Sequence, residues 1–221
     1  MKKAILTILL ILILDQWLKV WIKLNFHYGE SIVLIKDFID IQFVENPGMA
    51  FGWMIPGNGG KLALSIFRLF VVCGIGWYLY KLIRQKAHTG YIICMSMIVA
   101  GALGNIFDSL FYGILFDRGS VFDPEINDYT MYFGVSTINL NDGYAPPLLG
   151  NVVDMFHFTM RIPWGEGSIE IFPPIFNIAD SSISLAIIVI LLFQKKFFPK
   201  PTEKPVVAEV SESPVNVEIK D

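Results

Sequence analysis

Charged residues are scarce in this 221-residue chain: Lys, Arg, Asp and Glu together make up 17% of it. The net charge is −3 and no block of basic residues is present, which argues against binding to DNA or RNA through an electrostatic surface. Cysteine is equally sparse. The two cysteines, Cys73 and Cys94, lie inside apolar runs, which predicts small buried hydrophobic residues rather than a disulfide or a metal pair.

Signatures of several enzyme classes are missing too. The chain has three scattered histidines and no H-E-x-x-H motif, which argues against a zinc peptidase. His157 lies three residues beyond Asp154, but this pair alone does not make a metal site. No G-x-S-x-G motif and no Cys/His pairing signature occurs, so a serine or cysteine nucleophile has no support.

Apolar residues, in contrast, are abundant. They make up 54% of the chain, and the mean hydropathy of +0.55 is too high for an ordinary soluble domain. Four stretches are long enough to cross a bilayer as helices, at about 4–22, 62–83, 91–115 and 175–198. The first is not followed by a small-residue cleavage site, so we interpret it as an uncleaved helix rather than a signal peptide. The predicted fold is an all-α membrane core of four transmembrane helices.

Basic residues flank these stretches on one side of the membrane. They precede the first stretch, fill the link between the second and third, and follow the fourth: Lys2, Lys3, Lys81, Arg84, Lys86, Lys195, Lys196 and Lys200. By the positive-inside rule both termini are then cytoplasmic, and the long connections 23–61 and 116–174 lie on the opposite face. Residues 1–198 then form the membrane domain, and in a bacterium the face that carries the two connections is the periplasm.

The long connections contain short segments in which polar and apolar residues alternate. Segments 37–44, 131–140 and 168–172 partly follow period two, which predicts a small extracytoplasmic β-sheet resting on the membrane surface. Beyond the last apolar stretch, residues 199–221 carry four prolines and show no apolar periodicity. We expect this segment to be a disordered cytoplasmic tail.

Several polar residues lie inside the apolar stretches and need partners there. Asp15 and Lys19 are four residues apart, so they share a helix face and can form an ion pair; alternatively, Lys19 extends to the interface and Asp15 only accompanies it. Asn105 and Asp108 share a face of the third stretch, where either can orient a catalytic group or a substrate backbone. Small residues at 101, 102 and 104 indicate close helix packing.

Two further aspartates, Asp154 and Asp180, lie at the edges of apolar segments. A facing pair of carboxylates near hydrocarbon would share a proton, as the pair in aspartic proteases does. Simpler interpretations are that Asp154 is a solvated loop acid, and that Asp180, three residues after Asn177, is an N-cap or first-turn acid of the last helix. Asn46, in the turn Asn46-Pro47-Gly48, either closes a strand or holds a substrate carbonyl.

Five segments, taken in order, resemble the lipoprotein signal peptidase family, also called signal peptidase II. They are Asp15-x-x-x-Lys19, Asn46-x-Gly48-x-Ala50-Phe51-Gly52, Gly104-Asn105-x-x-Asp108, Val152-Val153-Asp154 and Phe176-Asn177-x-Ala179-Asp180. The resemblance runs from about residue 10 to residue 185 and includes the four-helix layout. It implies an aspartyl endopeptidase of the bacterial inner membrane that removes signal peptides from prolipoproteins, cutting just before a cysteine that carries diacylglycerol.

By this resemblance Asp154 and Asp180 fall on the catalytic pair. The other matching positions line the site or orient the pair and the substrate: Asp15, Lys19, Asn46, Gly48, Asn105, Asp108 and Asn177. The implied partners are diacylglyceryl-prolipoproteins and membrane lipids, at the periplasmic face, and no nucleic acid, metal or cofactor is expected. No sequence feature indicates an oligomeric state.

The chain departs from the family pattern in two places. Ser109 stands where the family usually has an arginine, and about 35 extra residues are present at 115–149. Arg118 is the only basic residue of this insertion. It either supplies the missing charge or is a solvated loop arginine paired with Asp117 or Asp123.

The residues alone also permit functions of other classes. A small membrane transporter or proton-conducting protein could use Asp15, Asp108 and Asp180 as an intramembrane relay. Such a relay should spread its carboxylates through the depth of the bilayer, whereas the best pair of aspartates is expected at one face. A non-catalytic membrane scaffold leaves that pair unexplained.

Overall fold

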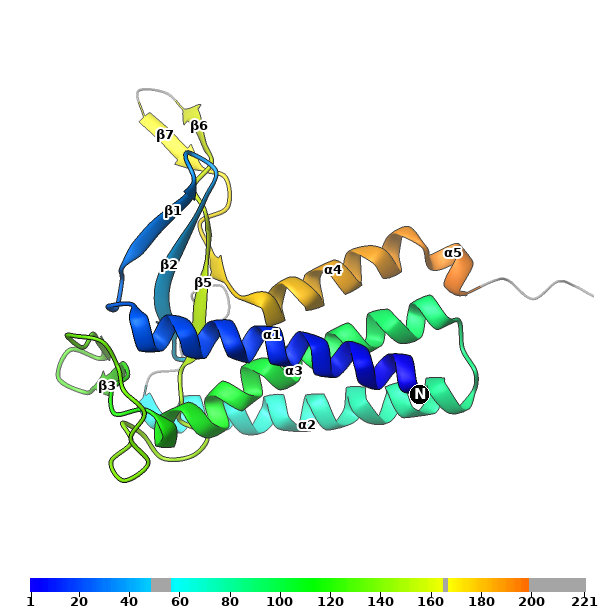
Figure 1. Cartoon of the computed structure of the whole chain (residues 1–221), viewed down its shortest axis with the longest axis horizontal. Helices are drawn as coiled ribbons and strands as arrows, with labels where there is room; N and C mark the ends of the chain where they lie inside the picture. Colours follow the sequence, from blue (N-terminus) through cyan, green and yellow to red (C-terminus); the bar gives the residue numbers. More distant parts are fainter. Residues whose placement is uncertain (49–56, 165–166, 199–221) are drawn as a thin grey trace, which may run out of the picture.

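The computed structural model describes residues 1–48, 57–164 and 167–198. Three of its helices, α1 (Lys2–Asn25), α2 (Gly57–Arg84) and α3 (Thr89–Leu115), are long and apolar enough to cross a membrane. α3 is central, because α1, α2 and the shorter α4 (Ile178–Leu192) all pack against it (Figure 1). The predicted tail at 199–221 and Ala50, Phe51 and Gly52 of the predicted motif lie outside the described residues.

The first three predicted helices are confirmed, with ends that differ by a few residues. The fourth was predicted from 175, but Ile175 and Phe176 form a strand and the helix begins at Ile178. α4 has 15 residues, about 22 Å of helix, which is shorter than a full span. The chain then continues through Phe193 into the one-turn helix α5 (Gln194–Phe197).

A four-stranded antiparallel sheet stands at one end of the helices. Its strands are β1 (Ser31–Ile35), β2 (Ile39–Asn46), β5 (Val152–Phe158) and β8 (Ile175–Phe176), in the order β1-β2-β5-β8. Two separate hairpins pair β3 (Val121–Asp123) with β4 (Asp128–Thr130) and β6 (Arg161–Trp164) with β7 (Gly167–Glu170). β5 lies between β2 and β8, so the segment that contains Asp154 is interior to the sheet.

The strand predictions are confirmed in two of three places. β2 covers most of segment 37–44, and β7 overlaps segment 168–172. Segment 131–140 is irregular, with only an isolated bridge between Phe116 and Ile138, so this prediction is wrong. Gly134 turns the chain with a φ of +85°, and the neighbouring Phe133 is 94% exposed, so the segment does not continue as a strand that buries its apolar side chains.

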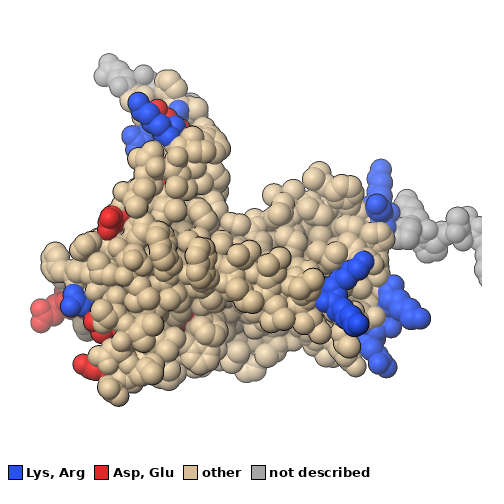
Figure 2. Space-filling view, viewed as in Figure 1, with Lys and Arg blue, Asp and Glu red and all other residues tan. Residues whose placement is uncertain are grey.

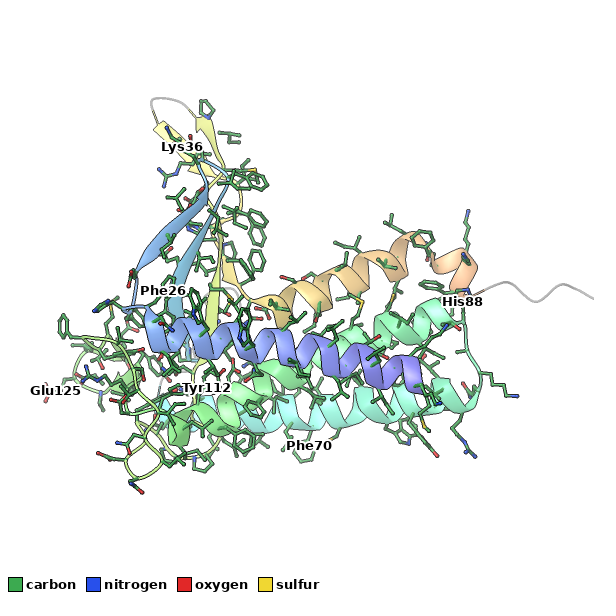
Figure 3. The ribbon with its side chains drawn as sticks, in the orientation of Figure 1. Phe26, Lys36, Phe70, His88, Tyr112 and Glu125 are labelled. Carbon is green, nitrogen blue, oxygen red and sulfur yellow. The ribbon has the colours of Figure 1, made fainter. Side chains whose placement is uncertain are left out.

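The sheet stands at one end of the helices and a group of basic residues at the other, while a second group, which includes Lys36, lies with acidic side chains at the tip of the sheet (Figure 2, Figure 3). β1, β2 and β5 leave the helices where α1 ends and α4 begins, and they project sideways from the helix axes (Figure 1). Lys and Arg side chains gather at the other end, near the N-terminus, the α2–α3 link and α5 (Figure 2). The visible face between the two ends is largely free of charged side chains, as a bilayer-spanning surface should be.

A hydrophobic cluster joins the sheet to the helices. Val153 and Met155 of β5 belong to it, and because side chains alternate along a strand, Asp154 between them points to the other face. Figure 3 shows Phe26 and Tyr112 at this junction. The buried members come from α1, β2, α3 and β5 and the residue after each of α1 and α3: Ile22, Phe26, Phe43, Tyr112, Phe116, Val153 and Met155.

The two cysteines differ in exposure. Cys94 of α3 is buried as predicted, but Cys73 is exposed on α2, so the prediction is wrong there. The reason is that much of α2 faces outward, with Phe67, Phe70 and Trp77 also exposed. In a membrane such a face contacts acyl chains, which are as apolar as the protein interior.

Candidate active site

β5 carries Asp154 into the interior of the protein. Only 3% of this residue is exposed, so its interpretation as a solvated loop acid is wrong. The cause is the central position of β5, in which every residue from Val152 to Met155 is buried. The carboxylate accepts hydrogen bonds from Asn46 Nδ2 at 3.2 Å and from Asn177 Nδ2 at 2.7 Å.

Asp180 comes from the first turn of α4. Asn177 is the N-cap of this helix and forms a capping box: its Oδ1 accepts the Asp180 N–H at 2.9 Å, and Asp180 Oδ2 accepts the Asn177 N–H at 3.3 Å. The prediction of a first-turn acid is thus confirmed as local structure. The cap leaves Asp180 Oδ1 for another donor, and Asn105 Nδ2 of α3 binds it at 2.8 Å.

Three asparagine amides therefore hold the two carboxylates. Asn46 and Asn177 donate to Asp154, and Asn105 donates to Asp180. Asn177 Nδ2 also lies 3.1 Å from Asn105 Oδ1, which links the two sets of bonds. Because these donors are neutral, the amides orient the carboxylates without bringing a positive charge into contact with them.

Burial raises the pKa of Asp154 to about 7, and the negative charge of Asp180 acts in the same direction. The charge of Lys19 and the hydrogen bonds from Asn46 and Asn177 oppose this increase. A carboxyl group with such a pKa keeps its proton up to neutral pH beside a second carboxylate. The arrangement can therefore provide an acid and a base at the same time.

An ion-paired cluster on α1 and α3 adjoins the residues that hold Asp180. Lys19 Nζ lies 2.9 Å from Asp15 Oδ2 and 2.8 Å from Asp108 Oδ2. Lys19 also donates to Asn105 Oδ1 at 2.9 Å. Its side chain is fully buried, so the predicted ion pair is confirmed and the extension of Lys19 to the interface is wrong. Asp15 Oδ1 accepts the Ala179 N–H at 2.9 Å, which ties the start of α4 to α1.

Two glycines of α3 permit this close approach. A Cβ atom added at Gly101 would lie 2.3 Å from Ala179 O, and one added at Gly104 would lie 2.7 Å from Asp15 Oδ2. A side chain at either position would force its neighbours apart, so the packing role predicted for Gly101 and Gly104 is confirmed. Because Asp180 directly follows Ala179, the packing of α4 on α3 also fixes its carboxylate.

Sequence reasoning missed two polar residues of this region. Gln16 Nε2 donates to Asp108 Oδ1 at 2.8 Å, and its Oε1 accepts from the Tyr112 hydroxyl at 3.1 Å. Arg68 of α2 donates from Nη2 to Gly48 O at 3.1 Å. Both residues had a signal in the sequence, because a glutamine and an arginine inside apolar stretches need polar partners in hydrocarbon.

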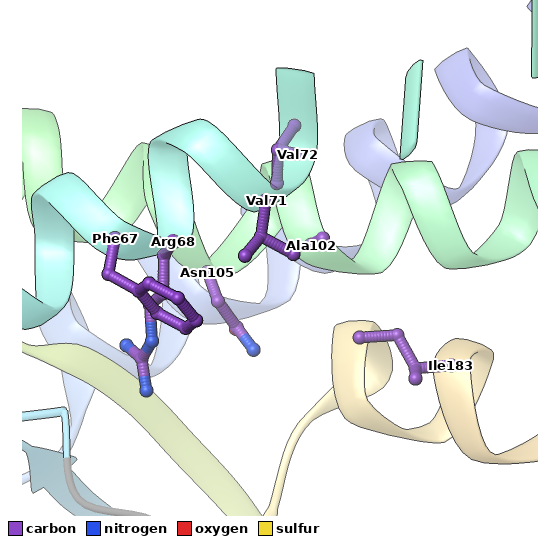
Figure 4. Close-up of a pocket in the computed structure, with 7 residues that line it drawn as sticks. All are labelled: Phe67, Arg68, Val71, Val72, Ala102, Asn105 and Ile183. Atoms are coloured by element: carbon purple, nitrogen blue, oxygen red, sulfur yellow. The ribbon is translucent and has the colours of Figure 1, made fainter. Parts of the chain in front are cut away.

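A pocket of about 200 Å³ lies beside these groups, between α2, α3 and α4 (Figure 4). Its wall is mostly apolar, and the Asn105 amide and the Arg68 guanidinium are its polar side chains. Among the residues that the structure describes, no group of three or more His, Cys, Asp or Glu side chains could hold a metal ion. The pocket is lined by Phe67, Arg68, Val71, Val72, Ala102, Asn105 and Ile183.

These groups lie within a region that matches a known family. The model of the family described as Signal peptidase (SPase) II matches residues 7–196, which is most of the chain. The chain belongs to the signal peptidase II family. It is therefore a membrane protease that removes signal peptides from lipoproteins.

Lipoprotein signal peptidases of other bacteria are similar to this chain along most of its length. That of Porphyromonas gingivalis is 37% identical over 196 residues, which cover 84% of this chain and 79% of the relative. That of Amoebophilus asiaticus is 28% identical over 208 residues, which cover 93% and 83%. A solved structure of a bacterial membrane enzyme, 23% identical, has the same fold, with a TM-score of 0.58 over 92% of this chain and 95% of that one.

The arginine expected by comparison with other signal peptidase II chains is not replaced by Arg118. Arg118 Nε lies 3.4 Å from Asp117 Oδ2, its Nη1 binds a backbone carbonyl of the same insertion, and its side chain is 47% exposed. The simpler interpretation, a loop arginine paired with Asp117, is confirmed. Ser109 itself donates to the Asn105 carbonyl at 3.2 Å within α3. Arg68, in contrast, is an arginine on which the charges of both Asp154 and Asp180 act.

Proposed function

We propose that this chain is an aspartyl endopeptidase of the bacterial inner membrane. Asp154 and Asp180 form its catalytic pair, and it cuts the precursor immediately before a cysteine that carries diacylglycerol. The observation that carries the proposal is the position of Asn177, which donates to Asp154 and caps the helical turn that holds Asp180. A single side chain thereby positions both carboxylates.

The chemistry needs one ionised and one protonated carboxyl group. The ionised group takes a proton from the water that attacks the scissile carbonyl carbon, while the protonated partner donates to the carbonyl oxygen. The tetrahedral intermediate then collapses, and a carboxyl group passes its proton to the leaving amine of the cysteine. Burial of Asp154 and repulsion by Asp180 favour the state with one shared proton near neutral pH.

Four membrane crossings with both termini in the cytoplasm fit the distribution of charge. The helix end at which Lys and Arg side chains gather without visible Asp or Glu is cytoplasmic by the positive-inside rule (Figure 2). The two carboxylates and the sheet belong to the other end, which is then the periplasmic face. α4 supplies about 22 Å of helix for the fourth crossing, and Phe193 and the short helix α5 continue the chain toward the end where the Lys and Arg side chains gather.

The periplasmic end offers separate places for the lipid and for the peptide. The mostly apolar pocket between α2 and α4 adjoins Asn105, which binds Asp180, and suits an acyl chain. The place for the peptide is the sheet. Aromatic rings contact one another there, and the ring of Phe158 packs against those of Phe38, Phe172 and Phe176. A cysteine anchored in the bilayer by its acyl chains would reach the catalytic pair with less loss of entropy than a free peptide would.

A proton relay or transporter is the competing function. It would need carboxylates that are distributed across the bilayer. Instead, Asp15 and Asp108 share the ammonium group of Lys19, and Asp15 accepts the backbone N–H that immediately precedes Asp180. All three carboxylates thus gather in one cluster, which supports proteolysis at one face over transport through the membrane.

The decisive experiment is cleavage of a diacylglyceryl-modified prolipoprotein by the purified chain. Wild type should release the signal peptide, whereas Asp154→Asn and Asp180→Asn should release none while still binding the substrate. Asp142→Asn, which changes an exposed acid, is the control and should cleave normally. Wild-type turnover by either catalytic variant would refute the aspartyl mechanism. Equal rates on lipidated and unlipidated precursors would refute the lipid requirement.

A further inference from the structure

Arg68 lies beside the proposed catalytic pair and takes no part in the mechanism above. It is half-buried on α2, and its Nη2 donates to Gly48 O at 3.1 Å. The Gly48 N–H in turn donates to Asn46 Oδ1 at 2.9 Å, and Asn46 donates to Asp154. The guanidinium is therefore one hydrogen-bonded turn away from a proposed catalytic carboxylate.

Among the residues that the structure describes, no carboxylate contacts the Arg68 guanidinium. None of the ion pairs among the described residues includes it, whereas Lys19 and Arg118 each contact carboxylates. The charges of Asp154 and Asp180 nevertheless act on Arg68. Arg68 thus places a positive charge near Asp154 and Asp180 without forming an ion pair with either of them.

Arg68 also forms part of the pocket wall. Figure 4 shows Arg68 and Asn105 projecting to the same side from α2 and α3, among apolar side chains. A guanidinium group carries five N–H donors in a planar fork, and the bond to Gly48 uses only one of them. Because Arg68 lines the pocket, its other N–H groups are available to a ligand that brings oxygen atoms into the pocket.

We propose that Arg68 is a substrate-binding residue that donates to a carbonyl oxygen near the scissile bond when substrate occupies the pocket between α2, α3 and α4. The inference rests on the proposed function. The ligand is a neutral oxygen because a further anion would be repelled by Asp154 and Asp180, whereas a carbonyl accepts from the guanidinium without adding charge. The substrate offers two such groups, a backbone carbonyl of the signal peptide and an ester carbonyl of the diacylglyceryl group.

The test compares kcat and KM of wild type, Arg68→Gln, Arg68→Lys and the control Arg118→Gln, all as full chains in detergent micelles. Arg68→Gln should raise KM about tenfold or more and leave kcat within about twofold, because it removes a contact with bound substrate and leaves both carboxylates in place. Arg68→Lys keeps a positive charge but loses the planar fork of donors. Its KM should therefore lie between that of wild type and that of Arg68→Gln. Arg118→Gln should match wild type, since that side chain pairs with Asp117 in the insertion.

A second substrate, in which ether links replace the ester links of the acyl chains, shows which carbonyl oxygen accepts from Arg68, because it lacks the ester carbonyls. An equal rise in KM for Arg68→Gln on both substrates assigns the bond to a peptide carbonyl, and a rise confined to the ester substrate assigns it to the lipid. Wild-type KM on both substrates overturns the inference, as does a fall in kcat and thermal stability at unchanged KM. If Arg68→Gln does not fold, a wild-type KM for Arg68→Lys overturns it instead. The proposed function survives these outcomes, because it is tested separately, by cleavage with the wild-type chain and by the Asp154→Asn and Asp180→Asn variants.

Discussion

Asn177 donates a hydrogen bond of 2.7 Å from its side-chain amide to Asp154 Oδ1. The carbonyl oxygen of the same amide accepts the Asp180 N–H at 2.9 Å and caps α4. The start of the helix and the orientation of both carboxylates therefore depend on one side chain. The two roles can be separated, because a serine hydroxyl caps a helix but is too short to replace the amide donor.

Asn177→Ser should keep the helix and lose activity. Serine caps helices about as well as asparagine, so the unfolding temperature should change little. The bond to Asp154 is lost, and we expect kcat to fall about tenfold or more, roughly 1.4 kcal/mol in the barrier. Asn177→Ala removes both roles and should also cost about 1 kcal/mol of stability. Thermal unfolding and single-turnover cleavage measure the two effects, and equal stability of the Ser and Ala variants would contradict the capping role.

Asp154→Asn should change how stability depends on pH. With a pKa of about 7 in place of the usual 3.8, folded Asp154 keeps a proton that the unfolded chain has released. Wild type therefore loses stability as the pH rises from about 4 to about 7, by a total on the order of 4 kcal/mol. The asparagine variant has no such proton and should be the more stable protein above pH 7. Unfolding temperatures measured from pH 4 to 8 test this, and parallel curves for the two proteins would count against a protonated, buried Asp154.

The sequence predicts those features that depend on short-range spacing. Apolar length determines α1, α2 and α3. Helical spacing brings Lys19 to Asp15 and Asp180 to Asn177, whatever surrounds them. The pairing of Asp180 with Asp154 is different, because 26 residues and a change from helix to strand separate them. The positions of both residues at the edges of apolar segments suggested a pair, and the order of the motifs in the resemblance then assigned that pair the catalytic role.

Features that depend on distant partners could not be predicted. β5 is buried on both faces next to Asp154, so it lacks the alternation that reveals a strand. Arg68 reaches Gly48 across a gap of 20 residues, and no local pattern indicates this contact. Lys23 and Glu45 lie in different elements, so the sequence gives no reason to expect that either charge is buried. In the folded protein they form a buried ion pair.

This last pair attaches the inserted segment 115–149 to the membrane core. Lys23 of α1 contacts Glu45 of β2, and both side chains are fully buried. Glu45 Oε2 accepts the Ser120 N–H at 2.7 Å, and Lys23 Nζ donates to Arg118 O at 2.9 Å. The insertion thereby supplies the hydrogen bonds that a buried ion pair requires.

Lys23→Met should destabilise the protein strongly. It leaves Glu45 as a buried charge without a cation in contact, which costs about 3–5 kcal/mol. Adding Glu45→Gln removes that charge, so the double variant should regain part of the loss. Arg161→Gln is the control, because it breaks an exposed pair with Glu170 and should hardly change the unfolding temperature. A Lys23→Met variant as stable as this control would mean that the buried pair does not anchor the insertion.

Gly101→Ala should impair the site through helix packing. The added Cβ would lie 2.3 Å from Ala179 O, a backbone atom, so α4 has to move away from α3. Overpacking of this kind costs about 1–3 kcal/mol, and because Asp180 is the next residue along α4, cleavage should fall as well.

Gly76→Ala in α2 is the matched control for this substitution. No atom lies within 4 Å of its added Cβ, and alanine favours a helix over glycine by up to about 1 kcal/mol, so this variant should be at least as stable as wild type and fully active. Unfolding temperature and cleavage rate of the two variants are measured together. If Gly101→Ala matched Gly76→Ala in both, α4 could shift without moving the carboxylate, and the rigid placement of Asp180 by α3 would be wrong.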